Sequence, residues 1–227
     1  MGELNKTTLG RVRGLVGDVV FRQRDGVNYV SSRPGEYPET TDPVILARRD
    51  KFKLTLKFAS SINSIDYLRE MWKPYSPAKG IGYNTMVRTN YAYINKGVIS
   101  ERASLVPVRG FAVNITSMDL SSTELKAALE ALGTGTGINE SVERNIYLAA
   151  IVHFSNPVVE ADKSYEFISL LSVPQSIDLV NPLNFSILLD SVEGQIFKAY
   201  QTNKIFATLF TVDANDKPAH FSSTFVK

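Results

Sequence analysis

The sequence predicts a mainly β protein with some α-helix: an N-terminal β-hairpin arm and a helical segment, followed by an immunoglobulin/fibronectin-like antiparallel β-sandwich. Three observations predict this class. Asp25-Gly26 separates two apolar runs, residues 44–65 contain neither glycine nor proline, and beyond Ser100 short apolar runs alternate with turn residues. We therefore divide the chain into a hairpin arm (1–42), a helical connecting region (43–99) and a sandwich domain (100–227).

The arm is predicted from its turn chemistry. Asp-Gly fits the tight type I′ turn of a β-hairpin, so the runs 19–21 and 27–30 on either side of Asp25-Gly26 are expected to pair. Gly10, Gly14 and Gly17 are expected at tight turns or at close backbone approaches. The stretch from Pro34 to Pro43 is expected to be a loop or an extended arm.

Residues 44–65 give two conflicting signals. Apolar and polar residues alternate over 51–58, which is typical of a strand, whereas more than 20 residues without glycine or proline favour a helix. Length favours the helix, with Thr41 or Asp42 as the cap, Pro43 in the first turn and an end at Asn63 or Ser64. A second, short helix is expected over 83–94.

Seven short strands are expected beyond Ser100, and their regular spacing indicates a sandwich. They cover Ala103–Arg109, Phe111–Ser117, Ile146–Phe154, Tyr165–Ser172, Asn184–Leu189, Lys204–Val212 and His220–Val226. A hairpin loop over 213–218 joins the last two. The run 122–132 is rich in helix formers, is capped by Ser121 or Ser122 and is closed by Gly133, so we expect a helix inserted near 122–132.

Composition restricts the function. The 25 basic and 23 acidic residues give a net charge of +2, too balanced to indicate a nucleic-acid or membrane partner by itself. The absence of cysteine excludes disulfides and thiolate chemistry. No signal peptide and no apolar run of about 18 residues is found, so we expect synthesis in the cytoplasm and no membrane span.

No recognisable catalytic motif is present. His153 and His220 each lie in an expected strand without metal-ligand spacing, so no metal site is expected. No Gly-x-Ser-x-Gly nucleophile motif occurs. The glycine-rich stretch 133–137 follows an expected helix and lacks a following Gly-Lys, which favours a flexible loop over a phosphate-binding loop.

Four carboxylates lie in expected loops, where solvated side chains are the rule: Glu140, Glu143, Glu160 and Asp162. Hydrolysis by a pair of carboxylates leaves no sequence signature, so that alternative stays open. Otherwise we expect a non-enzymatic protein with no catalytic residue, cofactor or metal.

The basic and aromatic front end is the candidate interaction site. Its residues are Arg11, Arg13, Phe21, Arg22, Arg24, Tyr29 and Arg33. They fit three interpretations: a surface that follows a phosphate backbone with stacking support, a solvated hairpin, or an arm that adds strands to a neighbouring copy.

Three stretches carry a resemblance: 14–34, 49–54 and 210–215 with 222–225. Together they resemble the signature of an uncharacterised bacterial family of unknown function, which opens with a glycine-rich hairpin ending in Arg-x-x-Pro or a similar pattern. The resemblance implies a fold but no catalytic residue. The middle of the chain departs from the pattern, near Ser122.

Members of that family look like small components of phage or prophage-like gene sets. The resemblance therefore implies a structural subunit of a virion or similar particle. Because the glycine- and arginine-rich hairpin cannot bury enough of itself alone, we expect the subunit to oligomerise through its N-terminal arm. The expected partners are copies of the chain or other particle subunits. The alternative is a ligand- or nucleic-acid-binding β-sandwich module that uses the basic hairpin.

Overall fold

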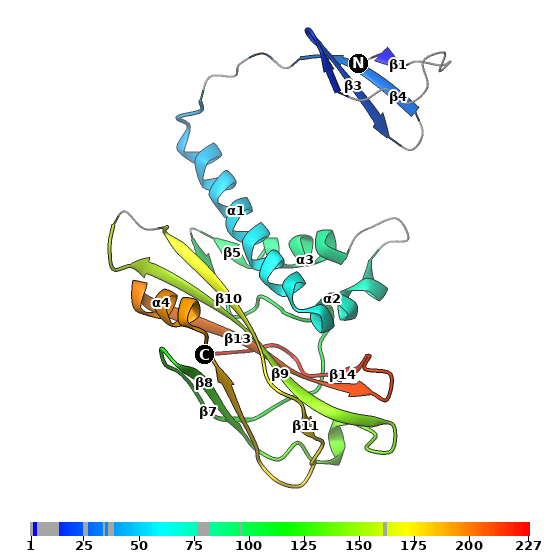
Figure 1. Cartoon of the computed structure of the whole chain (residues 1–227), viewed down its shortest axis with the longest axis vertical. Helices are drawn as coiled ribbons and strands as arrows, with labels where there is room; N and C mark the ends of the chain where they lie inside the picture. The colour runs from blue at the N-terminus through cyan, green and yellow to red at the C-terminus, as the bar shows by residue number, and fades with distance from the viewer. Residues whose placement is uncertain are drawn as a thin grey trace. The chain divides into compact units, whose positions relative to one another are not determined.

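A computed structural model gives the structure of the chain (Figure 1). It describes residues 2–3, 14–24, 27–33, 35, 39–76, 82–95, 97–160 and 163–227, without the side chains of residues 2, 3 and 24. The chain forms two compact units, Met1–Asp42 and Pro43–Lys227, and each is described by itself. With 41% strand and 27% helix, the predicted mainly β class with some α-helix is confirmed.

The N-terminal unit is an antiparallel sheet of four strands in the order β1-β4-β3-β2. The strands are β1 (Gly2–Glu3), β2 (Gly14–Val16), β3 (Val19–Arg24) and β4 (Val27–Ser32). The predicted hairpin is formed by β3 and β4, in which Arg24 pairs with Val27. Asp25-Gly26 and Gly10 lie outside the described residues. Gly17, at φ +56°, occupies the β2–β3 turn as expected.

A six-stranded antiparallel sheet lies at the centre of the second unit, with β10-β9-β13-β14 as its main path. Of the two remaining strands, β11 pairs with β9 and β15 pairs with β13. Its strands are β9 (Glu143–Pro157), β10 (Tyr165–Leu171), β11 (Gln175–Ser176), β13 (Tyr200–Asp213), β14 (Pro218–Phe221) and β15 (Phe225–Val226). Residues 146–154 of β9 are all buried. A strand buried on both sides requires a layer on each face of the sheet.

Helices supply one of these layers, as Figure 1 shows. They are α1 (Pro43–Ser64), α2 (Asp66–Trp72) and α3 (Gly82–Tyr91), with the short helix η1 (Lys73–Tyr75) after α2 and the two-stranded β5 (Ile94–Asn95) and β6 (Val98–Ile99) after α3. Phe58 and Trp72 pack with Phe206 and Phe210 of β13 in one core. Region 43–99 is therefore a layer of this unit and not a connection, because its helices share a core with the sheet.

A three-stranded sheet in the order β12-β8-β7 covers the other face and completes the β-sandwich. Its strands are β7 (Ile115–Leu120), β8 (Glu124–Leu129) and β12 (Leu183–Leu188); the short helix η2 (Thr134–Thr136) follows β8, and α4 (Ser191–Ala199) follows β12. Leu125, Leu148 and Leu209 share the second core. The chain thus has a sandwich of two sheets with helices on the outer face of the larger one.

The helix predicted near 122–132 is wrong, because residues 124–129 form the central strand β8. Leu125, Ala127 and Leu129 are buried, and the residues between them are not. This alternation with a period of two is typical of a strand with one buried face. Pairing with β7 and β12 on both sides outweighs the helix propensity of leucine, lysine and alanine.

Three of the other expected strands also differ. The strand expected over 220–226 is divided between β14 and β15, which pair with different parts of β13. Residues 103–109 are irregular, although Ala103, Leu105 and Val106 are buried. The strand expected over 111–117 begins only at Ile115. An irregular segment is possible at 103–109 because side chains satisfy its backbone: Ser104 N–H donates to Asn90 Oδ1 at 2.7 Å.

Candidate interaction site

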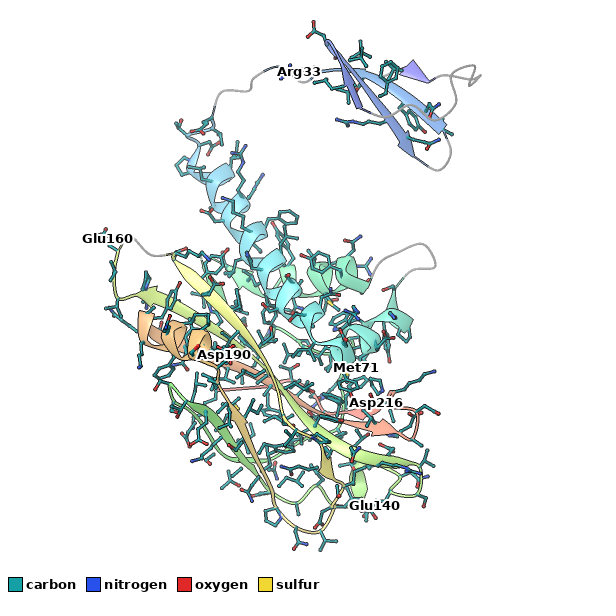
Figure 2. The ribbon with its side chains drawn as sticks, in the orientation of Figure 1. Arg33, Met71, Glu140, Glu160, Asp190 and Asp216 are labelled. Carbon is teal, nitrogen blue, oxygen red and sulfur yellow. The ribbon has the colours of Figure 1, made fainter. Side chains whose placement is uncertain are left out.

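The structure describes the side chains of four of the predicted interaction residues, all in the N-terminal unit. Arg11, Arg13 and the side chain of Arg24 lie outside the described residues. Phe21 and Tyr29 are half-buried, whereas Arg22 and Arg33 are exposed; Figure 2 labels Arg33 at the end of this sheet.

The sheet separates these residues onto two faces. Arg22 pairs directly with Tyr29, and Phe21 pairs with Val30. Directly paired residues share a face and consecutive residues alternate, so Arg22 and Tyr29 lie together while Phe21 lies on the opposite face. Arg33 donates its backbone N–H to Asp18 O at 2.6 Å, just beyond β4. The predicted patch is therefore not one continuous surface.

Both faces of this sheet carry apolar side chains. The register places Leu15, Val20 and Tyr29 on one face and Val16, Phe21 and Val30 on the other. Leu15 is 54% exposed and Val16 is 66% exposed. Of the side chains described in this unit, only that of Asn28 is buried, and neither hydrophobic core includes a residue of this unit. Both faces of this sheet therefore carry apolar side chains, and no other described part of the N-terminal unit covers either face.

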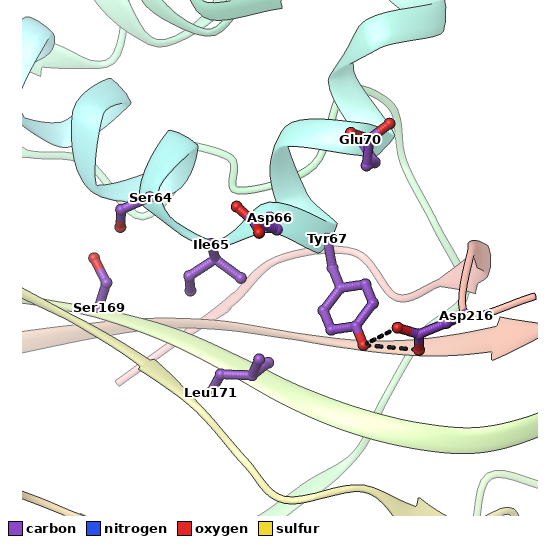
Figure 3. Close-up of a pocket in the computed structure, with 8 residues that line it drawn as sticks. All are labelled: Ser64, Ile65, Asp66, Tyr67, Glu70, Ser169, Leu171 and Asp216. Carbon is purple, nitrogen blue, oxygen red and sulfur yellow. Dashed lines mark hydrogen bonds between the residues drawn. The ribbon is translucent and has the colours of Figure 1, made fainter.

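A cavity of about 550 Å³ lies between α2, β10 and the β13–β14 turn in the second unit. Figure 3 shows Tyr67 pointing at Asp216, and the Tyr67 hydroxyl donates to both oxygens of that carboxylate at 2.8 and 2.9 Å. Burial, followed by hydrogen bonding, raises the pKa of Tyr67 well above its usual range. The phenol therefore stays protonated at neutral pH and does not act as a general base.

Two of the three carboxylates that line this cavity form ion pairs with nearby cations. Asp66 pairs with Arg69 at 2.9 Å, and Glu70 pairs with Lys73. Both pairs are exposed, where ion pairs contribute little to stability. The cavity thus holds a polar, hydrogen-bonded surface without a nucleophile activated by a base.

His220 and Glu143 form a polar contact in the second unit, and Glu143 has two further hydrogen-bond partners there. Glu143 Oε1 accepts the backbone N–H of Asn139 at 2.7 Å and lies 3.0 Å from His220 Nδ1, while its other oxygen accepts the Thr211 hydroxyl. The Glu143 side chain is 2% exposed and that of His220 is 46% exposed. A carboxylate at Nδ1 fixes the orientation of the imidazole ring.

Glu143 was expected among solvated loop carboxylates, and the structure corrects this: it opens strand β9 and is buried. Its partners Thr211 and His220 are 68 and 77 residues away in the chain, so no local pattern indicates the contact. Glu140 and Glu160 do lie in exposed turns (Figure 2), and Asp162 lies outside the described residues. A Cβ atom added to Gly137 would lie 3.9 Å from His220 Nε2. The glycine-rich stretch therefore passes beside this histidine.

The second histidine is buried in the core side of β9. His153 is 4% exposed and stacks on Phe167 with a centroid separation of 4.9 Å. Its Nε2 has no hydrogen-bond partner among the described residues. Burial, with a smaller effect of Lys204, lowers its pKa to about 4, so the ring is neutral at pH 7. His153 is thus a core residue and not an exposed ligand.

No group of three or more histidine, cysteine, aspartate or glutamate side chains in the described part of the chain is placed to hold a metal ion. Among the helices that the structure describes, none combines the length and apolar character needed to cross a membrane.

Comparison with known proteins found no family model that matches this sequence and no curated protein similar to it. The resemblance of 14–34 to a bacterial family of unknown function therefore stays a prediction.

Proposed function

We propose that this chain is a non-enzymatic structural subunit that assembles with copies of itself or with other subunits through its N-terminal sheet. The observation that carries the proposal is the sheet with apolar side chains on both faces and a single buried side chain, Asn28, among those described. A sheet is stable when its apolar face is covered by another layer. An assembled neighbour would supply that layer.

The exposed apolar side chains determine how strongly such an assembly would be stabilised. Burying a leucine or valine side chain contributes about 1.5–3 kcal/mol, so two or three such contacts per copy change an association constant by several orders of magnitude. Leu15 and Val16 are among the most exposed large apolar residues of the unit and lie on opposite faces. The resemblance of residues 14–34 to phage-associated proteins supports a virion as the particle in which the chain would assemble.

Size-exclusion chromatography with light scattering on the full chain tests the proposal. We expect the unchanged protein to form a multimer, and Leu15→Asp and Val16→Asp to shift it to smaller species. Val180→Asp is the matched control, because Val180 is 82% exposed in the second unit. A monomeric unchanged protein, or variants at 15 and 16 that assemble like the control, would refute the proposal.

A second candidate function is nucleic-acid binding by the same sheet. The register supports it by placing exposed Arg22 on one face with Tyr29, a combination that pairs a phosphate contact with a ring for stacking. Binding of single-stranded DNA should then weaken with salt and fall in Arg22→Ala with Arg24→Ala, but not in Arg102→Ala with Arg109→Ala. Equal binding by the two double variants would exclude this function.

A further inference from the structure

Helix α1 carries a second apolar stripe that does not face the sheet. Ile45, Phe52 and Leu56 are seven and four residues apart, a spacing that places them on one side of a helix. The buried stripe of α1, with Leu54, Phe58 and Ile62, lies on a different side. Ile45 is 40% exposed and Phe52 is 49% exposed, so a substantial part of this second stripe is in solvent.

Helix α3 completes a groove beside this stripe. Val87 and Tyr91, four residues apart on α3, are both half-buried and face the groove. The groove has a volume of about 410 Å³ and is lined by Phe52, Leu56, Asn84, Val87, Arg88 and Tyr91. Its walls come from two helices packed against each other and against the core, so its shape is fixed by the fold.

The two helices that form the groove carry a strong excess of basic side chains. Of these, Arg88 lines the groove and Lys51 lies over the ring of Tyr91. Five cations and one carboxylate lie in α1, and α3 adds one cation and no acid. The cations are Arg48, Arg49, Lys51, Lys53, Lys57 and Arg88. None of them forms an ion pair with another described residue. An apolar groove with an uncompensated basic rim attracts an apolar partner with acidic flanks.

The positive charge also argues against a second copy of the chain docking with its own groove at this groove. Two copies placed groove to groove would bring the basic rims together, and like charges across an interface cost several kcal/mol. Lys51 Nζ lies 4.3 Å from the centroid of the Tyr91 ring and occupies one face of it. A concave groove between helices instead suits the apolar face of a helical peptide segment.

We propose that the α1–α3 groove docks an acidic amphipathic helix of another protein, whose apolar side chains enter beside Phe52 and Tyr91 while its carboxylates meet the basic rim. This groove is formed by α1 and α3 of the second unit alone. The contact is driven by burial of apolar surface, and the charges select the partner.

The test uses the full chain and two labelled peptides about 16 residues long, followed by fluorescence anisotropy. Both carry leucines on one helical face; one has glutamates and the other lysines at the remaining charged positions. We expect the glutamate peptide to bind at least about tenfold more tightly than the lysine peptide, and its affinity to fall between about 50 and about 200 mM salt.

Three variants locate the site. Phe52→Ser should reduce binding of the glutamate peptide about tenfold, while Val180→Ser, a matched exposed position, should leave it unchanged. Reversing the rim with Arg49→Glu, Lys53→Glu and Arg88→Glu should transfer the preference to the lysine peptide, with circular dichroism confirming the fold. Equal affinity for both peptides, no binding of either, or binding insensitive to Phe52→Ser would overturn the proposal.

Two further probes separate other classes of partner. Vesicles containing anionic lipid and single-stranded DNA are tested against the same variants. If either binds more tightly than the glutamate peptide and loses that binding in Phe52→Ser, the groove serves a membrane or a nucleic acid and the proposal fails. Weaker binding of both, insensitive to Phe52→Ser, supports a protein partner.

Discussion

His220 Nδ1 lies 3.0 Å from Glu143 Oε1, which joins a half-exposed imidazole to a fully buried carboxylate. The same carboxylate accepts the backbone N–H of Asn139 and the hydroxyl of Thr211. Glu143 therefore links the start of β9 with β13 and β14, next to the register shift at Val212 and Asp213. Its contacts hold three strands and one turn together at one end of the sheet.

Replacing Glu143 by alanine should be more costly than replacing His220. Glu143→Ala removes the acceptor of the part-buried Asn139 N–H and the carboxylate acceptor of the buried Thr211 hydroxyl, which keeps only the longer contact to His220 O at 3.4 Å. Loss of a hydrogen bond at a buried group costs about 1–3 kcal/mol, so we expect the free energy of unfolding to fall by about 2 kcal/mol. For His220→Ala we expect less than about 1 kcal/mol, because the ring is partly solvated.

Urea unfolding monitored through Trp72, the single tryptophan, measures both changes. Glu140→Ala is the matched control, since Glu140 lies in the adjacent turn and is exposed. Losses of equal size for Glu143→Ala and Glu140→Ala would show that the buried contacts contribute little.

His153 should make the protein less stable in mild acid. Its pKa is lowered to about 4 by burial, below the value of about 6.5 expected in the unfolded chain. Above pH 6.5 the imidazole of His153 is neutral in both the folded and the unfolded chain, so its protonation does not affect the free energy of unfolding. Between pH 6.5 and 4 only the unfolded chain takes up the proton, so the free energy of unfolding falls by about 3 kcal/mol and then levels off.

His153→Phe separates this effect from that of the carboxylates. Phenylalanine suits the neighbouring ring of Phe167 and cannot be protonated, so the variant should lose less stability than the unchanged protein between pH 7 and 4.5. Parallel pH curves for His153→Phe and the unchanged protein would rule out His153 as the cause.

Trp72→Phe should destabilise the helix layer. The Trp72 indole N–H donates to Leu105 O at 2.8 Å, and the side chain is completely buried. The variant leaves that carbonyl without a donor and creates a cavity, for a combined loss of about 2–4 kcal/mol. Thermal unfolding by circular dichroism measures it. Tyr75→Phe, at a position 46% exposed, should change stability by less than about 0.5 kcal/mol.

The elements with a strong local signal were predictable. The long segment without glycine or proline forms α1, which begins at Pro43 and ends at Ser64 as expected. The Asp-Gly turn predicted the β3–β4 hairpin, and a two-residue connection also fixes the register that places Arg22 opposite Tyr29. Hairpin β13–β14 follows from the polar loop that precedes Pro218.

Features that depend on distant contacts were not predictable. Residues 124–129 combine helix-forming side chains with alternating burial, and only their strand neighbours decide between the two. The same holds for the groove between α1 and α3, whose walls meet only in the folded unit. Helix α4 was missed although its signal was present: Asp190 and Glu193 form a capping box, with Glu193 N–H donating to Asp190 at 2.8 Å.

Gly194 in α4 provides a final prediction, because two opposing effects act on one substitution. Alanine in a helix is favoured over glycine by about 1 kcal/mol. A Cβ at Gly194, however, would lie 2.5 Å from the backbone oxygen of Ser122, in the turn between β7 and β8. Backbone atoms in that turn cannot move aside like a flexible side chain, since Leu189 N–H already bonds to Thr123 O at 2.8 Å.

We therefore expect Gly194→Ala to lower the free energy of unfolding by about 1–3 kcal/mol, because the clash exceeds the gain in helix propensity. Gly135→Ala is the matched control: no atom lies within 4 Å of its Cβ and its φ is outside the left-handed region, so a gain of about 0.5 kcal/mol is expected. Chemical denaturation of both variants decides the matter. A neutral or stabilising Gly194→Ala would mean that α4 can move away from the β7–β8 turn at little cost, and that its contact with the small sheet is not required for the fold.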